Sequence, residues 1–203
     1  MNAKDWTLES SEAQRPGQQT KTVKAEAANA KNLDQAGDVK IVIDGGTLTV
    51  DAEGDGLDAN GSIEINGGTV VVNGPTSGAN AALDYDNNAK LNGGTVLFVD
   101  NGGMTMGFGS DSSQAFLMAS VQGAAGATVE VVDSSGKTVA SLKASKSFST
   151  VLISSPEIKE GEKYTIKVGS NSTTATASKQ ATNVGGGPGG GGRPGQGGRP
   201  GGR

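Results

Sequence analysis

Oxygen-bearing side chains recur in the same local pattern at two places in the chain. Leu57-Asp58-Ala59-Asn60 in the first copy matches Leu83-Asp84-Tyr85-Asp86 in the second, which begins 26 residues later. In each copy an apolar residue precedes an aspartate, and another oxygen donor follows two residues on. Residues two apart in a β-strand face the same side, so each copy predicts a strand with both oxygen donors on one face. The chemistry open to such a face is the binding of a cation by oxygen.

Stacking the two copies as neighbouring strands would place their carboxylates about 5 Å apart. At the effective dielectric of a protein surface, two such charges repel by about 3 kcal/mol. Calcium relieves this repulsion, because it takes six to eight oxygen ligands from carboxylates, amides, backbone carbonyls and water. The side chains predicted to supply the metal site are Asp34, Asp55, Asp58, Asn60, Asp84 and Asp86. Aspartate and asparagine also favour solvated positions beside glycine turns, so the residues leave a calcium site and a simple solvated edge both open.

Composition narrows the chemistry further. The chain of 203 residues has no cysteine and no histidine, which excludes disulfides, thiolate sites, imidazole ligands and a Ser-His-Asp triad. Any metal must be held by oxygen, which favours calcium over zinc or copper. Only 3% of the residues are aromatic, whereas 34 are glycine, a composition that suits many short strands joined by tight turns.

Charge and hydropathy exclude other classes of partner. The formal net charge is −4, but the Gly/Pro/Arg-rich end from Gly185 to Arg203 carries three arginines and no acid. The rest of the chain, with 14 basic and 21 acidic residues, has a net charge of −7, which argues against nucleic acid. No apolar run is long enough to span a membrane, and Met1–Asp5 does not open a signal peptide, so we expect a cytosolic protein or a trimmed piece of an exported one.

Internal repeats predict the fold. Gly-Gly-Thr occurs at residues 45, 67 and 93, with spacings of 22 and 26, and the apolar-Asp pairs that begin at Leu33, Leu57 and Leu83 are spaced by 24 and 26. A period of twenty-odd residues is typical of a solenoid. Alternating apolar positions should stack in register as ladders: Ile41, Ile63 and Ala89; Ile43, Ile65 and Leu91; Leu48, Val70 and Val96. We therefore expect an all-β fold built as a parallel β-helix.

Four parts of the chain follow from this prediction. Residues 1–30 form a leader or a partial first coil, and residues 31–112 form the coils of the solenoid. Residues 113–169 form a β-rich C-terminal part packed on the solenoid, in which strands are expected at Thr128–Val132, Thr138–Leu142, Ser149–Ser154 and Lys163–Val168. Residues 170–203, which are rich first in Ser and Thr and then in Gly, Pro and Arg, form a disordered tail.

Three strings in the repeats resemble a known family. They are Asp55-Gly56-Leu57-Asp58-Ala59-Asn60-Gly61, Asn73-Gly74-Pro75-Thr76-Ser77-Gly78 and Leu83-Asp84-Tyr85-Asp86. They look like the carbohydrate-binding β-helix family of exported clostridial-type proteins. The resemblance implies a right-handed parallel β-helix similar to polysaccharide lyases, with calcium sites. It also implies binding of plant cell-wall polysaccharides, such as pectic acid and cellulose, outside the cell or at its surface.

The function that we expect is calcium-dependent binding of polysaccharide by a monomer, without catalysis. Asp58, Asp84, Asn60 and Lys90 are the candidate sugar-binding residues, with acidic polymer held through calcium. Strand parity turns Tyr85 away from the aspartates, which favours uronate-rich ligands over the flat faces of cellulose. Two alternatives remain. One is a structural or adhesive solenoid that uses calcium as a staple, and the other is a pectate-lyase-like enzyme in which calcium acidifies the uronate proton and an arginine or lysine abstracts it, with Lys40 and Lys90 as the possible lysines.

Overall fold

The computed structural model describes residues 25–26, 39–77, 80–101 and 104–180. Every regular element in these ranges is a β-strand, and none of the described residues belongs to a helix that could cross a membrane. The strands of the first half are β1 (Ala25–Glu26), β2 (Lys40–Ile43), β3 (Thr47–Asp51), β4 (Leu57–Ala59), β5 (Ser62–Ile65), β6 (Thr69–Asn73), β7 (Leu83–Tyr85), β8 (Asn88–Leu91) and β9 (Thr95–Asp100). Those of the second half are β10 (Leu117–Gly123), β11 (Thr128–Val132), β12 (Thr138–Lys143), β13 (Phe148–Ser154), β14 (Lys163–Val168) and β15 (Asn171–Thr176).

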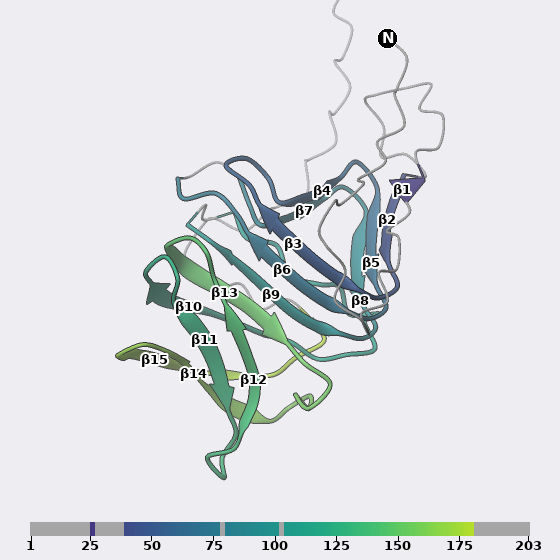
Figure 1. Ribbon diagram of the computed structural model, residues 1–203. Helices are drawn as coiled ribbons and strands as arrows, with labels where there is room; N and C mark the ends of the chain where they lie inside the picture. The colour runs from purple at the N-terminus through teal and green to yellow at the C-terminus, as the bar shows by residue number, and fades with distance from the viewer. Residues whose placement is uncertain (1–24, 27–38, 78–79, 102–103, 181–203) are drawn as a thin grey trace, which may run out of the picture.

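The sequence repeats pair with one another as parallel strands. β2 pairs with β5 and β5 with β8, so that Ile41, Ile63 and Ala89 lie in register. β3, β6 and β9 pair in the same way, and β4 pairs with β7 (Figure 1). The predicted register of these ladders is confirmed. It is fixed because a shift of one residue would turn the apolar side chains of a strand outward.

The apolar faces of these ladders enclose one core. It contains Ile63 and Leu91 from one side and Val70 and Val96 from another, all fully buried. At the end of the stack Phe108 is fully buried between Phe98 and Phe116, with ring centroids 5.8 and 5.6 Å away. Both ring pairs are edge-to-face, the arrangement that the aromatic quadrupole favours. Phe108 therefore closes the core beyond the last repeat.

The corner after each repeat is closed by glycine and asparagine. Gly68 and Gly94 have φ values of 90° and 99°, and a Cβ at Gly68 would lie 2.6 Å from the carbonyl oxygen of Gly46. Only glycine fits this left-handed conformation and close backbone approach. On the outer side of the corner, Asn92 Nδ2 donates to Asn66 Oδ1 at 2.8 Å, and Asn66 Nδ2 donates to Asp44 Oδ1 at 2.9 Å. Equivalent positions of the three repeats thus form one row of hydrogen-bonded side chains, from Asn92 through Asn66 to Asp44.

The prediction of a right-handed parallel β-helix is wrong. The described strands form separate sheets with the orders β1-β2-β5-β8, β10-β13-β9-β6-β3, β12-β11-β14-β15 and β4-β7, and no solenoid closes. The second of these sheets is mixed, because β13 pairs with β9 in the antiparallel sense and places Leu152 opposite Phe98. β13 occupies the edge to which a further parallel strand would have to add, and so parallel stacking stops after three copies.

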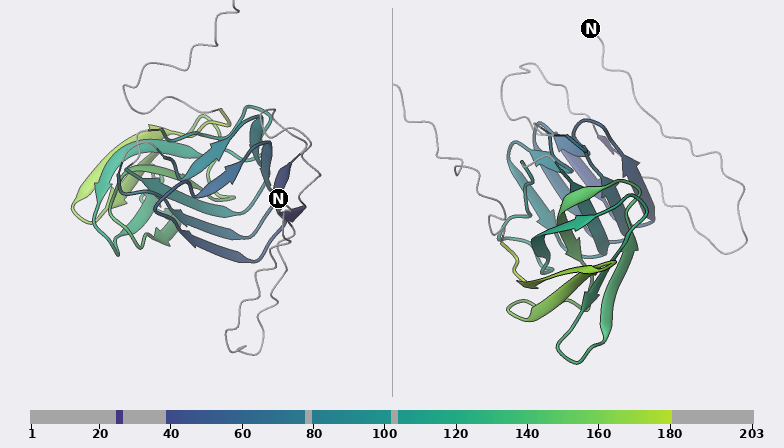
Figure 2. Two further views of the ribbon diagram at one scale, coloured as in Figure 1. Left: turned by 90° about the horizontal axis from the view of Figure 1, so that it is seen from above. Right: turned by 90° about the vertical axis from the view of Figure 1, so that its left-hand side faces the viewer.

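The four strands expected in the second half are confirmed within one residue at each end, as β11, β12, β13 and β14. β11, β12, β14 and β15 form an antiparallel sheet that lies to one side of the stacked repeats (Figure 2). The turn from β11 to β12 is held by Asp133, whose Oδ1 accepts from the backbone N–H groups of Ser135 and Lys137, both at 2.9 Å. Gly136 supplies the positive φ that this turn needs.

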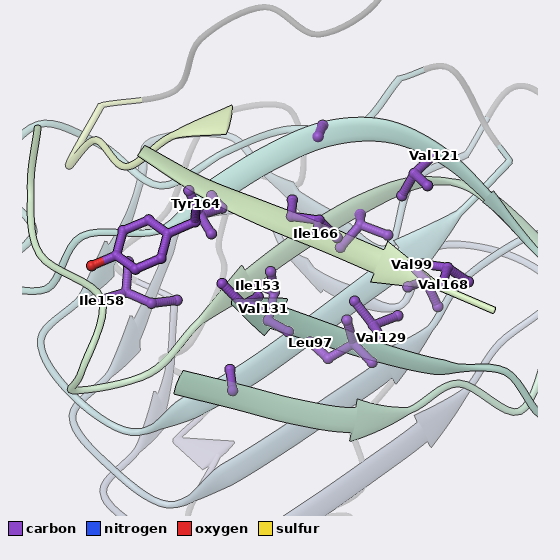
Figure 3. Close-up of a cluster of buried hydrophobic side chains, with 14 of the residues drawn as sticks. Leu97, Val99, Val121, Val129, Val131, Ile153, Ile158, Tyr164, Ile166 and Val168 are labelled. Atoms are coloured by element: carbon purple, nitrogen blue, oxygen red, sulfur yellow. The ribbon is translucent and has the colours of Figure 1, made fainter. Parts of the chain in front are cut away.

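A second apolar core joins this sheet to the mixed one. Figure 3 shows Leu97 and Val99 of β9 together with Val129 and Val131 of β11 and Ile166 of β14, all buried in one cluster. Two-faced burial explains why β9 reads as an almost continuous apolar run and not as an alternating one. β9 therefore contributes to both cores, since Val96 and Phe98 face the core of the repeats.

The loop between β12 and β13 also ties the two halves together. The Lys146 side chain is only 14% exposed, and its Nζ lies 2.9 Å from Asp51 Oδ1 and 2.8 Å from Glu53 Oε1. It also donates to the carbonyl oxygen of Ala52 at 2.6 Å. Burial alone would lower the pKa of Lys146, but the hydrogen bonds that it donates to Glu53 and Asp51 offset that effect and raise the pKa. Lys146 is thus a fixed cation at the end of β3.

The chain after residue 170 differs from the prediction where it is described. Asn171–Thr176 form β15, which pairs with β14, and Phe116 bridges to Ser178, so the expected disordered tail does not start at residue 170. Alternating Thr and Ser side chains fit an exposed antiparallel edge strand as readily as a disordered segment, and this was the source of the error. Residues 25–26 of the expected leader form β1, antiparallel to β2. The Gly/Pro/Arg segment lies outside the described residues.

Candidate functional site

Asp58 and Asp84 lie side by side on the two-stranded sheet of β4 and β7. β4 and β7 are three-residue parallel strands, and Asp58 of one is the register partner of Asp84 of the other. Leu57, Ala59 and Leu83 are buried on the opposite side of this sheet. Asp58 is exposed and Asp84 half-buried, on the face that alternation gives to solvent. The predicted alignment of the two carboxylates is confirmed, and neighbouring strands hold their Cα atoms about 4.8 Å apart.

The surroundings of this pair disfavour the ionised form of Asp58. The pKa of Asp58 is raised above its ordinary value, first by partial burial and then by the negative charges of Asp84, Asp55 and Asp86. Among the described residues, no lysine or arginine forms an ion pair with Asp58 or Asp84. A group of carboxylates that raises the pKa of its own member favours any cation that approaches it.

Asn60 and Asp86 continue the pair at the bends that follow β4 and β7. The backbone N–H of Asp86 donates to the carbonyl oxygen of Ala59 at 3.1 Å, which keeps the two bends in the same relation as the strands. Both side chains are exposed. We call Asp58, Asn60, Asp84 and Asp86 the acidic ladder. Its four oxygen-bearing side chains come from matching positions of two successive repeats.

Asp55, one of the predicted metal ligands, uses one of its carboxylate oxygens in a hydrogen bond within the protein. Its Oδ1 accepts a hydrogen bond from the backbone N–H of Ala81 at 2.7 Å, next to a backbone hydrogen bond from Gly56 to Ala81. Asp55 therefore fixes the loop before β4 to the loop before β7, while its charge still acts on Asp58. Asp34, the sixth predicted ligand, lies outside the described residues.

Lys90 is not part of the acidic ladder. It lies on β8, in the sheet of β2 and β5, where its Nζ pairs with Asp111 Oδ2 at 2.6 Å. Asn88 Nδ2 donates to both oxygens of the same carboxylate, at 3.1 and 3.0 Å. Asp111 was missed from the sequence because it follows the last repeat, where no periodic position marks it. Lys40 is likewise paired, with Glu64 on the neighbouring strand.

The acidic ladder fits calcium only with help from other oxygens. No group of three or more Asp or Glu side chains among the described residues is arranged to hold a metal ion. Asp58 and Asp84 supply two carboxylates, whereas calcium takes six to eight oxygens. The Asn60 amide, the Asp86 carboxylate, backbone carbonyls, water or a ligand's own oxygens would have to supply the others. Any cation held here would therefore keep most of its coordination sphere open to water or to a ligand.

Comparison with known families identifies the family to which the chain belongs. A family model described as carbohydrate-binding domain-containing protein matches residues 16–188 of the chain. The protein belongs to this family. The match covers the repeats and the antiparallel sheet together, and so it includes both the acidic ladder and the second core. Comparisons with curated proteins and with solved structures gave no significant match. Membership confirms the carbohydrate-binding part of the resemblance seen in the sequence, and a polysaccharide is accordingly the partner to consider.

In this carbohydrate-binding protein the aromatic side chain nearest the acidic ladder is not a stacking platform. Tyr85 packs against the core of the repeats, and its hydroxyl donates to the carbonyl oxygen of Gly107 at 2.6 Å. Partial burial and the charge of Asp84 raise its pKa. Over the described part of the chain, Met104 is the one large hydrophobic side chain that is exposed, at 59%. The acidic ladder therefore offers polar contacts and no stacking surface.

Proposed function

We propose that this protein binds uronate-rich polysaccharide outside the cell, without catalysis, and that calcium joins the acidic ladder to the carboxylates of the polymer. The observation that carries the proposal is the register of Asp58 with Asp84. Partial burial and then the charge of Asp84 raise the pKa of Asp58, and neither carboxylate forms an ion pair with a described lysine or arginine. Bound calcium would supply a positive charge shared between protein and polymer. Asp58 and Asp84 would hold it, with Asn60 and Asp86 beside them.

The incomplete ligand set supports an acidic partner. A site with two aligned carboxylates leaves most of the calcium coordination sphere to water or to a ligand, and uronate carboxylates are oxygen donors of the kind that calcium prefers. Without a cation, the negative ladder would repel the same polymer. Calcium dependence and preference for acidic sugar are therefore expected together. The described residues offer no exposed aromatic ring for the flat face of cellulose, which supports the same preference.

Binding without catalysis is supported by the state of the lysines. A lyase needs a general base with a pKa near the working pH, positioned at the uronate carbon. The hydrogen bond that Lys90 donates to Asp111, followed by the charge of Asp111, raises the pKa of Lys90 and so keeps this side chain protonated. Lys40 is engaged by Glu64. Neither side chain adjoins the acidic ladder in its sheet, so neither is placed to abstract a proton from sugar held there.

Calorimetric titration with an oligogalacturonate tests the proposal. We expect wild-type protein to bind it in calcium and not in chelator, and Asp58→Asn with Asp84→Asn to abolish binding in both. The matched control is Glu130→Gln, which removes one exposed carboxylate from β11 and should leave binding unchanged. Equal binding by the double variant and the control would refute the acidic ladder as the site.

Two further measurements on the same protein distinguish polysaccharide binding from a structural role for calcium and from lyase activity. A rise in melting temperature with calcium that the polymer does not increase further would indicate a structural staple and overturn the polysaccharide proposal, because a ligand stabilises in proportion to its binding. Appearance of unsaturated uronate product would indicate a lyase and overturn the non-catalytic assignment.

A further inference from the structure

A polar hollow, separate from the acidic ladder, lies where the mixed sheet and the antiparallel sheet meet. Its volume is about 340 Å³, within the usual size range of small-molecule pockets. Its lining comes from the end of β9, from β10 and the turn after it, from the start of β13 and from the start of β15. The lining residues are Asn101, Gln122, Gly123, Ala124, Ser147, Phe148, Ser149 and Asn171. We call this the amide hollow.

Two asparagines of the amide hollow are held in place by the backbone. Asn101 Nδ2 donates to the carbonyl oxygen of Ser147 at 3.1 Å, and Asn171 Nδ2 donates to the carbonyl oxygen of Gln122 at 2.8 Å. Each side chain amide has two N–H donors and one carbonyl acceptor. One N–H of each is thus used to fix the side chain, while the other N–H and the oxygen stay available to a ligand. Fixed donors and acceptors cost less entropy on binding than free ones.

An irregularity in β10 shapes the amide hollow. The pairing of β10 with β13 shifts between Ser120, opposite Thr150, and Gly123, opposite Phe148, so β10 carries one extra residue. Bulges of this kind redirect side chains and recur beside functional sites. A Cβ at Gly123 would lie 2.1 Å from the Phe148 ring, and the ring is only 2% exposed. Phe148 therefore forms a packed support beneath the hollow, and the bulge lifts Gln122 to its exposed rim.

The charge of the amide hollow separates it from the acidic ladder. Its lining contains three amide side chains and two hydroxyls and no Asp, Glu, Lys or Arg. Amides and hydroxyls both donate and accept, as sugar hydroxyls do, and an uncharged lining gives no compensation for burying a uronate carboxylate. The strands that line it belong to other sheets than β4 and β7.

We propose that the amide hollow is a second carbohydrate subsite, which takes one neutral sugar residue of a polysaccharide and needs no calcium. The proposal rests on the carbohydrate-binding family of the protein and not on the calcium-dependent function proposed above. Asn101 and Asn171 present fixed donors and acceptors to the sugar hydroxyls. Gln122 and Ser149 add contacts from the two paired strands.

The test uses the full chain with cellotetraose, a neutral oligosaccharide, in chelator-containing buffer. Binding is followed by ¹⁵N-edited NMR, with the side-chain amide signals of Asn101, Gln122 and Asn171 as the readout. We expect these signals to shift on titration, and Gln122→Ala with Asn171→Ala to weaken binding about tenfold, because two hydrogen-bonding side chains are lost from the lining. Ala124→Leu, which fills the hollow and removes no hydrogen bond, should weaken it as well.

Matched controls keep this result distinct from the calcium-dependent site. Gln180→Ala removes an exposed glutamine outside the amide hollow and should bind cellotetraose as the wild type does. Asp58→Asn with Asp84→Asn should also bind it normally, whether or not these substitutions abolish oligogalacturonate binding. Absence of any shift at millimolar cellotetraose, or equal binding by wild type, Gln122→Ala with Asn171→Ala, and Ala124→Leu, would overturn the proposal.

Discussion

Replacing Asp58 by asparagine removes one charge from the acidic ladder and keeps the shape of the side chain. The folded protein raises the pKa of Asp58 through partial burial and then through Asp84, Asp55 and Asp86. A raised carboxyl pKa means that the folded state binds the proton more tightly than the unfolded state does. Ionised Asp58 therefore destabilises the fold at neutral pH, and Asp58→Asn is expected to be more stable than wild type in the absence of calcium.

The size of the gain follows from the strand spacing. Two charges about 5 Å apart repel by about 3 kcal/mol at an effective dielectric of 20 and by about 0.8 kcal/mol in water. Asp58 is exposed, so the value near the aqueous limit applies, and we expect about 1 kcal/mol. For a chain of 203 residues, 1 kcal/mol corresponds to a rise in melting temperature of roughly 2–4 °C.

Differential scanning calorimetry in chelator between pH 7 and pH 4 measures this effect. The sign of the linkage sets the pH window: the penalty is absent below the ordinary pKa of 3.8 and is complete once the pH exceeds the raised value. The gain of Asp58→Asn should therefore be full at pH 7 and shrink as the pH approaches 3.8. Glu130→Gln should stay within about 0.5 kcal/mol of wild type throughout. An unchanged or lower melting temperature at pH 7, or a gain independent of pH, would refute the reasoning.

Three other substitutions test the surrounding fold by urea denaturation. Phe108→Ala should cost about 3–5 kcal/mol, because it empties the closed end of the repeat core, and a loss below about 1 kcal/mol would contradict that role. Lys146→Met should cost about 1–2 kcal/mol through lost hydrogen bonds at the end of β3, with Lys143→Met, exposed on β12, as a neutral control. Glu64 has a pKa lowered chiefly by its hydrogen bond with Lys40, so it stabilises above its ordinary pKa of 4.5 and loses this contribution as the pH falls through the lower, folded value. Glu64→Gln should be less stable than wild type at pH 7 and equal to it once the wild-type carboxyl is protonated; a difference that stays constant with pH would count against the assignment.

The sequence repeats were enough to predict which residues meet within the ladders. Ile41, Ile63 and Ala89 align as expected, and so do Asp58 and Asp84, because alternation and burial fix the register of a half-buried strand. The asparagine stack was predictable for the same reason. These contacts join positions of one repeat to equivalent positions of the next, and the period alone relates them.

The all-β class followed from the sequence, but the arrangement of the sheets could not be obtained in this way. The alternation of β13 is the same whether it pairs parallel or antiparallel, and its partner β9 lies some fifty residues earlier in the chain. A period that ends after three copies says nothing about what pairs with the last strand. The ion pair of Lys90 could not be predicted for the same reason, since its partner Asp111 belongs to no repeat. The amide hollow is assembled from four separate elements and has no local motif at all.

The glycine corners determine which insertions the repeats can accommodate. Gly68 and Gly94 each lie against the carbonyl oxygen of the glycine one repeat before, so a single inserted residue there would push a Cβ into backbone. Duplicating a complete unit of 22 or 26 residues keeps every glycine in place and adds two oxygen-bearing side chains to the acidic ladder, as the Asp58 and Asn60 pair or the Asp84 and Asp86 pair. Length is thus modular, and the valency of the ladder toward a repetitive polymer would rise by whole steps, with avidity gained at each step and no new type of contact.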